Sequence, residues 1–310
     1  MTLGICLVAS LLVMGTVAAG LAAAAPSSFS ALAASVVPGL LAASPNISLP
    51  ADLTPTLATA KDDVPRAAAE PCHSRYGETY PGSCKFLKHG NKLVLLIGDS
   101  LAVQWFPAIY RVAKEHRWRF ITMTKSACPV ADVPTDRQGK PDTACETWRK
   151  NAFAKVKRLH PDLVIASSLD VYTFVGDGGH PTSPRSQSIW GAGLQRSLVS
   201  LRKASGKVVM LGDVQHWGRG AIPCLEAHPN NIGRCEVPAD LPLQVRREKT
   251  ARKAAAAARV SFASTRKLTC PSDPCPLVVG RYLVTRDGGH LSATFAATLW
   301  RGMDQLLPSP

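Results

Sequence analysis

Two short segments of the sequence hold the residue types that acyl-transfer chemistry needs. They are Gly98-Asp99-Ser100 and Asp287-Gly288-Gly289-His290. A serine hydroxyl becomes a nucleophile when a histidine takes its proton, and a carboxylate can hold that histidine in the correct tautomer. Asp287 precedes His290 across a Gly-Gly turn, so its carboxylate can reach the imidazole. The sequence therefore predicts Ser100 as nucleophile, His290 as general base and Asp287 as the residue that orients it.

Each segment also has an ordinary structural interpretation. Serine and aspartate are common in turns and at helix N-caps, and an Asp-x-x-His loop can be a solvent-exposed loop. The relative positions of the two segments favour chemistry. Gly98-Asp99-Ser100 follows the first predicted strand of the domain, and His290 precedes its last predicted helix. Active sites of open α/β sheets collect beyond the carboxyl ends of the strands, where both segments would meet.

Short apolar runs alternate with helical patterns along the chain. The predicted strands are 92–97, 119–124, 163–167, 208–211 and 260–263, with two short extended pieces within 277–285. The predicted helices are 101–116, 145–159, 190–204, 241–259 and 292–306. This alternation predicts an α/β fold with a parallel sheet that helices cover on both faces.

The predicted turn after the first strand suits a nucleophile. Gly98 permits a tight turn, and Ser100 then lies at a helix N-terminus, where its own N–H can stabilise developing negative charge. Further polar residues in this turn and after the next three strands are predicted to contact substrate: Asp99, Ser126, Ser168 and Asp213. For Asp213 and nearby His216, a structural or surface role is the alternative.

The N-terminal part of the chain predicts export. Residues 3–25 form an apolar run of 23 residues, long enough to cross a bilayer, and end in small residues of the kind that signal peptidases accept. Because no Lys or Arg precedes the run, a cleaved signal, a retained anchor and the last span of a longer membrane protein stay open. The predicted organisation is a signal or transmembrane segment (1–25), an Ala/Pro/Ser-rich linker (26–60) and one domain outside the cytoplasm (61–310).

The composition limits the function classes. Hydrophobic residues make up 46% of the chain and charged residues 19%, which excludes disorder for the bulk of it. All 36 basic residues but only 21 of the 22 acidic ones follow residue 60, so the domain carries a charge of +15. This charge suits lipid headgroups or acidic glycans, and a basic solvated face is the alternative. No nucleic-acid motif is present, and no nucleic acid is expected as a partner.

Nine cysteines also point to export. Apart from Cys6 in the apolar run, eight form four sequence-local pairs: Cys72/Cys84, Cys128/Cys145, Cys224/Cys235 and Cys270/Cys275. Of the 105 connectivities that eight cysteines allow, we predict the nearest-neighbour one, since each pair brackets a Pro-rich or polar loop. Zinc is the alternative at the last pair, but no second pair or His cluster completes such a site, and no metal is expected.

The chain resembles the SGNH (GDSL-type) hydrolase superfamily over residues 55–307. It is most similar to the extracytoplasmic SGNH domain fused to bacterial type 3 membrane acyltransferases. The segments that carry this resemblance are Ala60–Pro65, Cys72, Leu96–Ala108, Lys125–Pro129, Cys145–Arg149, Trp190–Leu194, Cys275–Gly280 and Arg286–Thr294. The multi-span acyltransferase half of such proteins is missing from this sequence.

The resemblance implies a three-layer α/β/α flavodoxin-like fold and the same triad, with no cofactor. It implies an O-acyltransferase or esterase that moves a short acyl group, such as acetyl, to or from a cell-envelope glycan. SGNH enzymes usually add oxyanion donors from a Gly after strand two and an Asn after strand three. Here those positions read Thr124-Lys125-Ser126 and Ser167-Ser168-Leu169-Asp170, so backbone N–H groups near Ser126 or Ser168 are the candidate substitutes.

A function without catalysis is the competing hypothesis. The missing Gly and Asn also fit a disulfide-stapled envelope module that binds anionic polymer. A third possibility is an accessory subunit of a separate membrane acyltransferase. The sequence leaves open the acyl donor, the acceptor, the oligomeric state and the choice between transfer and hydrolysis.

Overall fold

The computed structural model describes residues 1, 48–69, 71–82, 84–175, 180 and 182–310. Apart from Met1, the predicted signal or transmembrane segment lies outside the described residues, as does the first part of the predicted linker, 26–47. Among the described residues, no helix combines the length and the apolar character needed to span a membrane.

A seven-stranded sheet forms the centre of the domain, in the order β1-β4-β3-β7-β8-β9, with β2 paired to β4. All strand pairs are parallel except β2 with β4. The strands are β1 (His73–Ser74), β2 (Cys84–Leu87), β3 (Leu93–Gly98), β4 (Arg119–Lys125), β7 (Leu163–Ser167), β8 (Lys207–Leu211) and β9 (Ser261–Ala263). The predicted α/β fold with a mostly parallel sheet is therefore confirmed.

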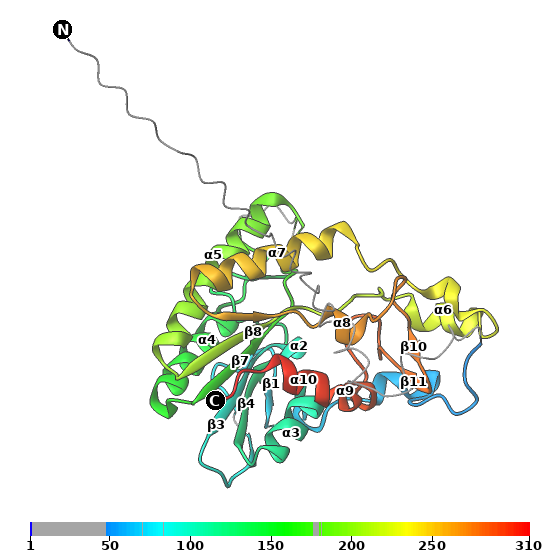
Figure 1. Cartoon of the computed structure of the whole chain (residues 1–310), viewed down its shortest axis with the longest axis horizontal. Helices are drawn as coiled ribbons and strands as arrows, with labels where there is room; N and C mark the ends of the chain where they lie inside the picture. The colour runs from blue at the N-terminus through cyan, green and yellow to red at the C-terminus, as the bar shows by residue number, and fades with distance from the viewer. Residues whose placement is uncertain (2–47, 70, 83, 176–179, 181) are drawn as a thin grey trace.

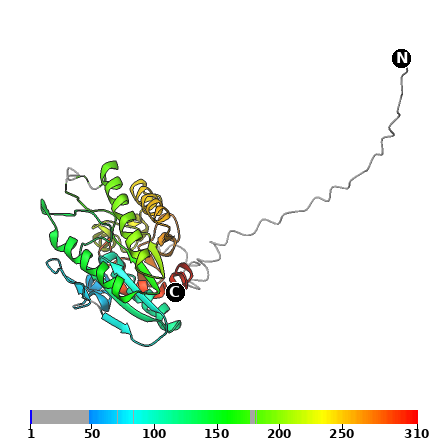
Figure 2. The same cartoon turned by 90° about the vertical axis from the view of Figure 1, so that its left-hand side faces the viewer.

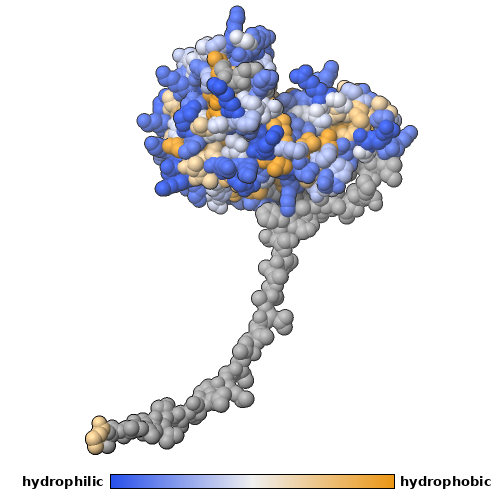
Figure 3. Space-filling model, turned by 90° about the horizontal axis from the view of Figure 1, so that it is seen from above, coloured by the Kyte–Doolittle hydropathy of each residue, from blue (hydrophilic) through white to orange (hydrophobic). Residues whose placement is uncertain are grey.

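Helices cover both faces of the sheet (Figures 1 and 2). One face packs against α3 (Phe106–Glu115), α9 (Ala293–Thr298) and α10 (Trp300–Leu306), and the other against α4 (Thr143–Leu159), α5 (Pro184–Lys203) and α7 (Pro242–Ala257). Because side chains of a strand alternate between faces, Val94 and Leu96 of β3 enter the first core, whereas Leu95 and Ile97 enter the second. The molecule thus has three layers. The face shown in Figure 3 is mostly hydrophilic, with small separate apolar patches.

Shorter elements complete the described part of the chain. They are α2 (Ser100–Val103), α6 (Ala221–Ala227), α8 (Arg266–Thr269), η1 (Leu57–Asp62), η2 (Arg66–Ala68), η3 (Ile232–Cys235) and the hairpins β5 (Asp136–Arg137)–β6 (Lys140–Pro141) and β10 (Val278–Val279)–β11 (Tyr282–Leu283). Residues 48–60, at the end of the predicted linker, contact the domain: Leu53 is buried, and Thr54 bridges to Tyr282.

Four disulfides connect the cysteines of the domain in the predicted nearest-neighbour pattern. They join Cys72 to Cys84, Cys128 to Cys145, Cys224 to Cys235, and Cys270 to Cys275. The last pair is thus a disulfide and not half of a zinc site. Each bond closes a short loop, of 5 to 17 residues.

Two predicted helices are each divided in the structure. The segment 101–116 forms α2 and α3, because Pro107 has no N–H to continue the hydrogen-bond ladder. The segment 292–306 forms α9 and α10, with Leu299 between them. The short strands β1 and β2 at the sheet edge were not predicted, since neither has a long apolar run.

Candidate active site

The turn after β3 presents Ser100 at the carboxyl edge of the sheet. Gly98 has a φ of 150°, and a Cβ at this position would lie 1.7 Å from the carbonyl oxygen of Ser167, so only glycine fits. Ser100 begins α2, and its N–H has no acceptor among the described residues. Both the hydroxyl and the N–H of Ser100 are therefore available at this edge.

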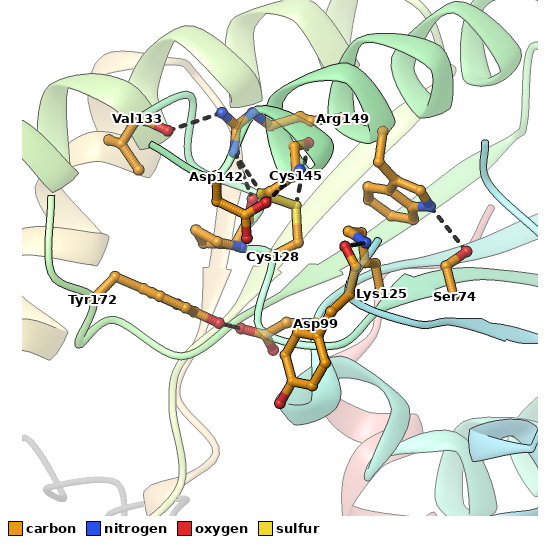
Figure 4. Close-up of a disulfide and its surroundings, with 12 residues drawn as sticks. Ser74, Asp99, Lys125, Cys128, Val133, Asp142, Cys145, Arg149 and Tyr172 are labelled. Atoms are coloured by element: carbon orange, nitrogen blue, oxygen red, sulfur yellow. Dashed lines mark hydrogen bonds between the residues drawn. A yellow bond between two sulfur atoms is a disulfide. The ribbon is translucent and has the colours of Figure 1, made fainter. Parts of the chain in front are cut away.

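The buried side chain of Asp99 holds this turn in place through hydrogen bonds. Its side chain is fully buried, and Oδ1 accepts a hydrogen bond from the Leu101 N–H at 2.8 Å. Oδ2 accepts from the Leu169 N–H at 2.9 Å and from the Tyr172 hydroxyl at 2.6 Å, the bond drawn in Figure 4. Burial raises the pKa of Asp99 to about 6, although these three hydrogen bonds act in the opposite direction. Asp99 was predicted to contact substrate, but both of its oxygens bind protein groups and hold the loops after β3 and β7 together.

The loop before α9 brings a histidine to Ser100. His290 Nε2 lies 2.8 Å from Ser100 Oγ, and His290 Nδ1 lies 2.8 Å from Asp287 Oδ2. Asp287 Oδ1 accepts hydrogen bonds from the backbone N–H groups of Gly289 and His290, at 2.9 and 2.7 Å. The three residues predicted as a triad thus form one continuous hydrogen-bonded chain.

The charge state of Asp287 suits an orienting role. Partial burial alone would raise its pKa, but the hydrogen bond and charge of His290 and two backbone N–H groups lower the pKa well below its usual range. The carboxylate is therefore ionised at neutral pH. An ionised carboxylate beside Nδ1 favours the tautomer in which Nδ1 carries the hydrogen and Nε2 is free to take the serine proton.

Neighbouring segments hold the histidine loop in place. Gln104 Oε1 accepts from the N–H of Leu291 at 2.9 Å. Thr285 Oγ1 accepts from the Gly288 N–H at 2.8 Å and donates to the His290 carbonyl at 2.7 Å. The sequence indicated no role for Gln104 or Thr285, because each acts only through contacts made in the folded chain.

Ser126, predicted to contact substrate, is half-buried after β4. Its hydroxyl lies 3.0 Å from His73 Nε2, and its backbone N–H donates to the Ser74 carbonyl at 2.9 Å. That N–H is therefore already engaged and is not a free oxyanion donor. His73 was missed by sequence reasoning, since it lies on a two-residue strand with no recognisable pattern.

The other two predicted substrate contacts lie after β7 and β8, apart from the triad's hydrogen bonds. Ser168 is buried, and its hydroxyl has no partner among the described residues. Asp213 accepts from the Val214 N–H at 2.7 Å and lies 2.9 Å from His216 Nε2. Burial lowers the pKa of His216, but the charge and hydrogen bond of Asp213 outweigh burial, and the net pKa is raised.

Comparison with solved structures shows a similar fold in the periplasmic domain of an acetyltransferase. The structure is similar to the periplasmic domain of a lipopolysaccharide acetyltransferase from Salmonella ser. Paratyphi A, with 17% identity over 71% of this chain and 84% of that one and a TM-score of 0.55. It is more weakly similar to Axe2, an acetylxylan esterase from Geobacillus stearothermophilus, with 13% identity over 73% of this chain and 98% of that one and a TM-score of 0.43. The second likeness is too weak to support an argument. No curated protein matches the chain.

The sequence itself matches a family of known description. The model of the family described as "SGNH domain (fused to AT3 domains)" matches residues 71–304, which is most of the chain and all of the sheet. The match includes the turn with Ser100 and the loop with Asp287 and His290. The chain therefore belongs to the SGNH domain family of the kind fused to AT3 domains, a class of acyltransferases and carboxylic ester hydrolases.

Proposed function

We propose that the protein is an extracytoplasmic serine enzyme that moves a short acyl group, most simply acetyl, to or from a cell-envelope glycan. The hydrogen-bonded chain from Ser100 through His290 to Asp287, with both side-chain distances at 2.8 Å, carries this proposal. Nucleophile, base and orienting carboxylate are each within hydrogen-bond reach of the next.

The geometry supports a two-step reaction through an acyl-enzyme. His290 Nε2 takes the Ser100 proton as Oγ attacks the acyl carbonyl carbon, and the free Ser100 N–H stabilises the oxyanion. The ester C–O bond then breaks, and the leaving alkoxide takes the proton from His290. In the second step His290 deprotonates water or a sugar hydroxyl, which attacks the acyl carbon and releases Ser100 with its proton restored. Water gives hydrolysis, and a sugar hydroxyl gives transfer.

Four observations support the substrate class and the location. The family is fused to AT3 domains, which implies a membrane acyltransferase as the source of acyl groups. The similar Salmonella domain is named as periplasmic and as part of a lipopolysaccharide acetyltransferase. Four disulfides need an oxidising compartment, and the charge of +15 after residue 60 suits an anionic glycan.

The test uses the full chain, made in an oxidising compartment and purified in mild detergent. Hydrolysis of p-nitrophenyl acetate and labelling by a fluorophosphonate are measured for wild type, Ser100→Ala and Ser197→Ala. Ser197 is a matched control, since its hydroxyl is buried in α5 without a hydrogen-bond partner among the described residues. We expect wild type and Ser197→Ala to react and Ser100→Ala to be inert.

Two further results decide between the alternatives. Faster release of p-nitrophenol on adding an envelope glycan, with acetyl recovered on the glycan, indicates a transferase. A folded wild type that neither hydrolyses the ester nor takes the label contradicts the catalytic proposal. Binding to anionic polymer that weakens with salt and is unchanged by Ser100→Ala would then support the binding module.

A further inference from the structure

A second serine–histidine contact lies beside the triad, and the two-step reaction above does not use it. His73 of β1 reaches over the end of β4, with its Nε2 3.0 Å from Ser126 Oγ and its Nδ1 2.9 Å from Thr124 Oγ1. Strand register brings this group to the nucleophile: Thr124 pairs with Gly98, and Ser126 and Ser100 each follow two residues later.

The buried Thr124 hydroxyl fixes the tautomer of His73. Thr124 is fully buried, and in the described part of the chain its hydroxyl has one partner, His73 Nδ1. A buried O–H without an acceptor is costly, so Thr124 donates and Nδ1 accepts. The ring hydrogen of neutral His73 must then be on Nε2, from where it donates to Ser126 Oγ.

With Thr124 and His73 donating in this way, the hydroxyl hydrogen of Ser126 is not needed for either bond. Ser126 Oγ accepts from His73, and no other partner of Oγ is found among the described residues. The hydroxyl hydrogen of half-buried Ser126 is therefore free to bind another acceptor at the carboxyl edge of the sheet. A ring that stays neutral preserves this arrangement, and burial, together with the charges of Lys125, His290 and Arg286, lowers the pKa of His73 to about 4.

The backbone of Ser126 itself does not supply a free donor on the β4 side. The Ser126 N–H is engaged by the Ser74 carbonyl, and no glycine stands at this position to provide a free backbone N–H. A hydroxyl can replace an N–H in an oxyanion hole, because either donates one hydrogen bond to the developing charge.

We propose that the Ser126 hydroxyl is an oxyanion donor that acts together with the Ser100 N–H, and that Thr124 and His73 are positioning residues that aim it. This inference rests on the proposed acyl-enzyme reaction. Ser126 donates a hydrogen bond to the carbonyl oxygen as that oxygen becomes negative, and its proton stays on Ser126 throughout.

Ester hydrolysis by the full chain tests the donor. Ser126→Ala should lower kcat for p-nitrophenyl acetate by about 100-fold with little change in KM, since the bond forms in the transition state. Thr124→Val should lower kcat by about tenfold, because it removes one hydrogen bond that sets the tautomer, and Thr124→Ser should restore activity. Ser197→Ala is the control for loss of a buried hydroxyl and should match wild type, and thermal unfolding checks that each variant is folded.

The tautomer gives a readout that a merely structural role would not change. Long-range proton–nitrogen NMR correlations of the His73 ring, assigned with His73→Gln, should show the hydrogen on Nε2 in wild type and in Thr124→Ser, and a shift toward Nδ1 in Thr124→Val. A wild-type His73 with its hydrogen on Nδ1 overturns the inference, as does Ser126→Ala activity within about threefold of wild type.

The two proposals fail in different ways. If wild type hydrolyses the ester and Ser126→Ala does so equally well, the Ser126 inference is wrong and the triad stands. If fluorophosphonate does not label Ser100 in folded wild type, the acyl-enzyme reaction and the Ser126 inference are both wrong.

Discussion

The substitution Asp287→Asn tests the triad most directly, because the two carboxylate oxygens have different partners. Oδ1 accepts from the backbone N–H groups of Gly289 and His290, at 2.9 and 2.7 Å. Oδ2 faces the His290 ring at 2.8 Å. An asparagine has one oxygen that accepts and one nitrogen that donates, so it cannot fill both places in the same way.

The structure fixes which way the asparagine must turn. Two backbone donors require its oxygen at the Oδ1 position, which leaves its NH₂ group facing His290 Nδ1. His290 must then accept at Nδ1 and carry its hydrogen on Nε2, where it cannot take the Ser100 proton. A wrong tautomer of this kind lowers kcat by about 10⁴-fold, or about 5 kcal/mol of transition-state stabilisation.

The assay is kcat for p-nitrophenyl acetate with the full chain, and Asp304→Asn is the matched control. Asp304 Oδ1 lies 2.7 Å from His116 Nε2, the same kind of pair on a different part of the surface. We expect Asp304→Asn to match wild type while Asp287→Asn loses nearly all activity and stays folded. Asp287→Asn activity within about tenfold of wild type would refute the tautomer argument.

Three stability predictions follow from buried features, each measured by urea unfolding. Gly98→Ala should cost at least about 3 kcal/mol, because the new Cβ meets a carbonyl oxygen at 1.7 Å, whereas Gly220→Ala, with nothing within 4 Å, should cost under about 0.5 kcal/mol; equal losses would contradict this. The pKa of Asp99 in the folded protein, about 6, exceeds the ordinary value of 3.8. Protonated Asp99 therefore contributes to the free energy of unfolding below pH 3.8, and this contribution, about 3 kcal/mol, is lost as pH rises through about 6. Asp99→Asn should remove that pH dependence. A difference in free energy of unfolding between Asp99→Asn and wild type that stays constant with pH would contradict this prediction. Replacing Cys128 and Cys145 by alanine should cost about 3 kcal/mol, given their separation of 17 residues, and no loss would contradict the loop-closure argument.

The sequence was sufficient to predict five of the seven strands of the sheet, because each of these five is a short apolar run that suits a buried strand. It was not sufficient for β1 and β2, which have no such run. The predicted strand 163–167 coincides with β7, and the predicted 119–124 differs from β4 by one residue. The division of the helix after Ser100 had a signal in Pro107. The division at Leu299 had none, since no proline or other helix-breaking residue stands at this position.

The site was predictable only in part, because its supporting contacts join distant residues. Asp287 and His290 are local to one loop, and their spacing indicated that the carboxylate could reach the ring. Asp99 has the residue type of a substrate contact, but its burial under Tyr172 becomes apparent only when the loop after β7 is in place. Likewise, His73 reaches Ser126 across 53 residues of sequence, and no local pattern indicates such a contact.

The sequence-local disulfides have a consequence for how the protein is made. The two cysteines of each pair are 5 to 17 residues apart, and no pair encloses or overlaps another. On the export route that we propose, the chain enters an oxidising compartment from its N-terminus, and each cysteine of the domain meets its correct partner before any cysteine of the next pair has emerged. Short loops also close much faster than the long-range contacts of a parallel sheet form. Order of synthesis alone can therefore select one connectivity, and the chain should mature correctly without a disulfide isomerase.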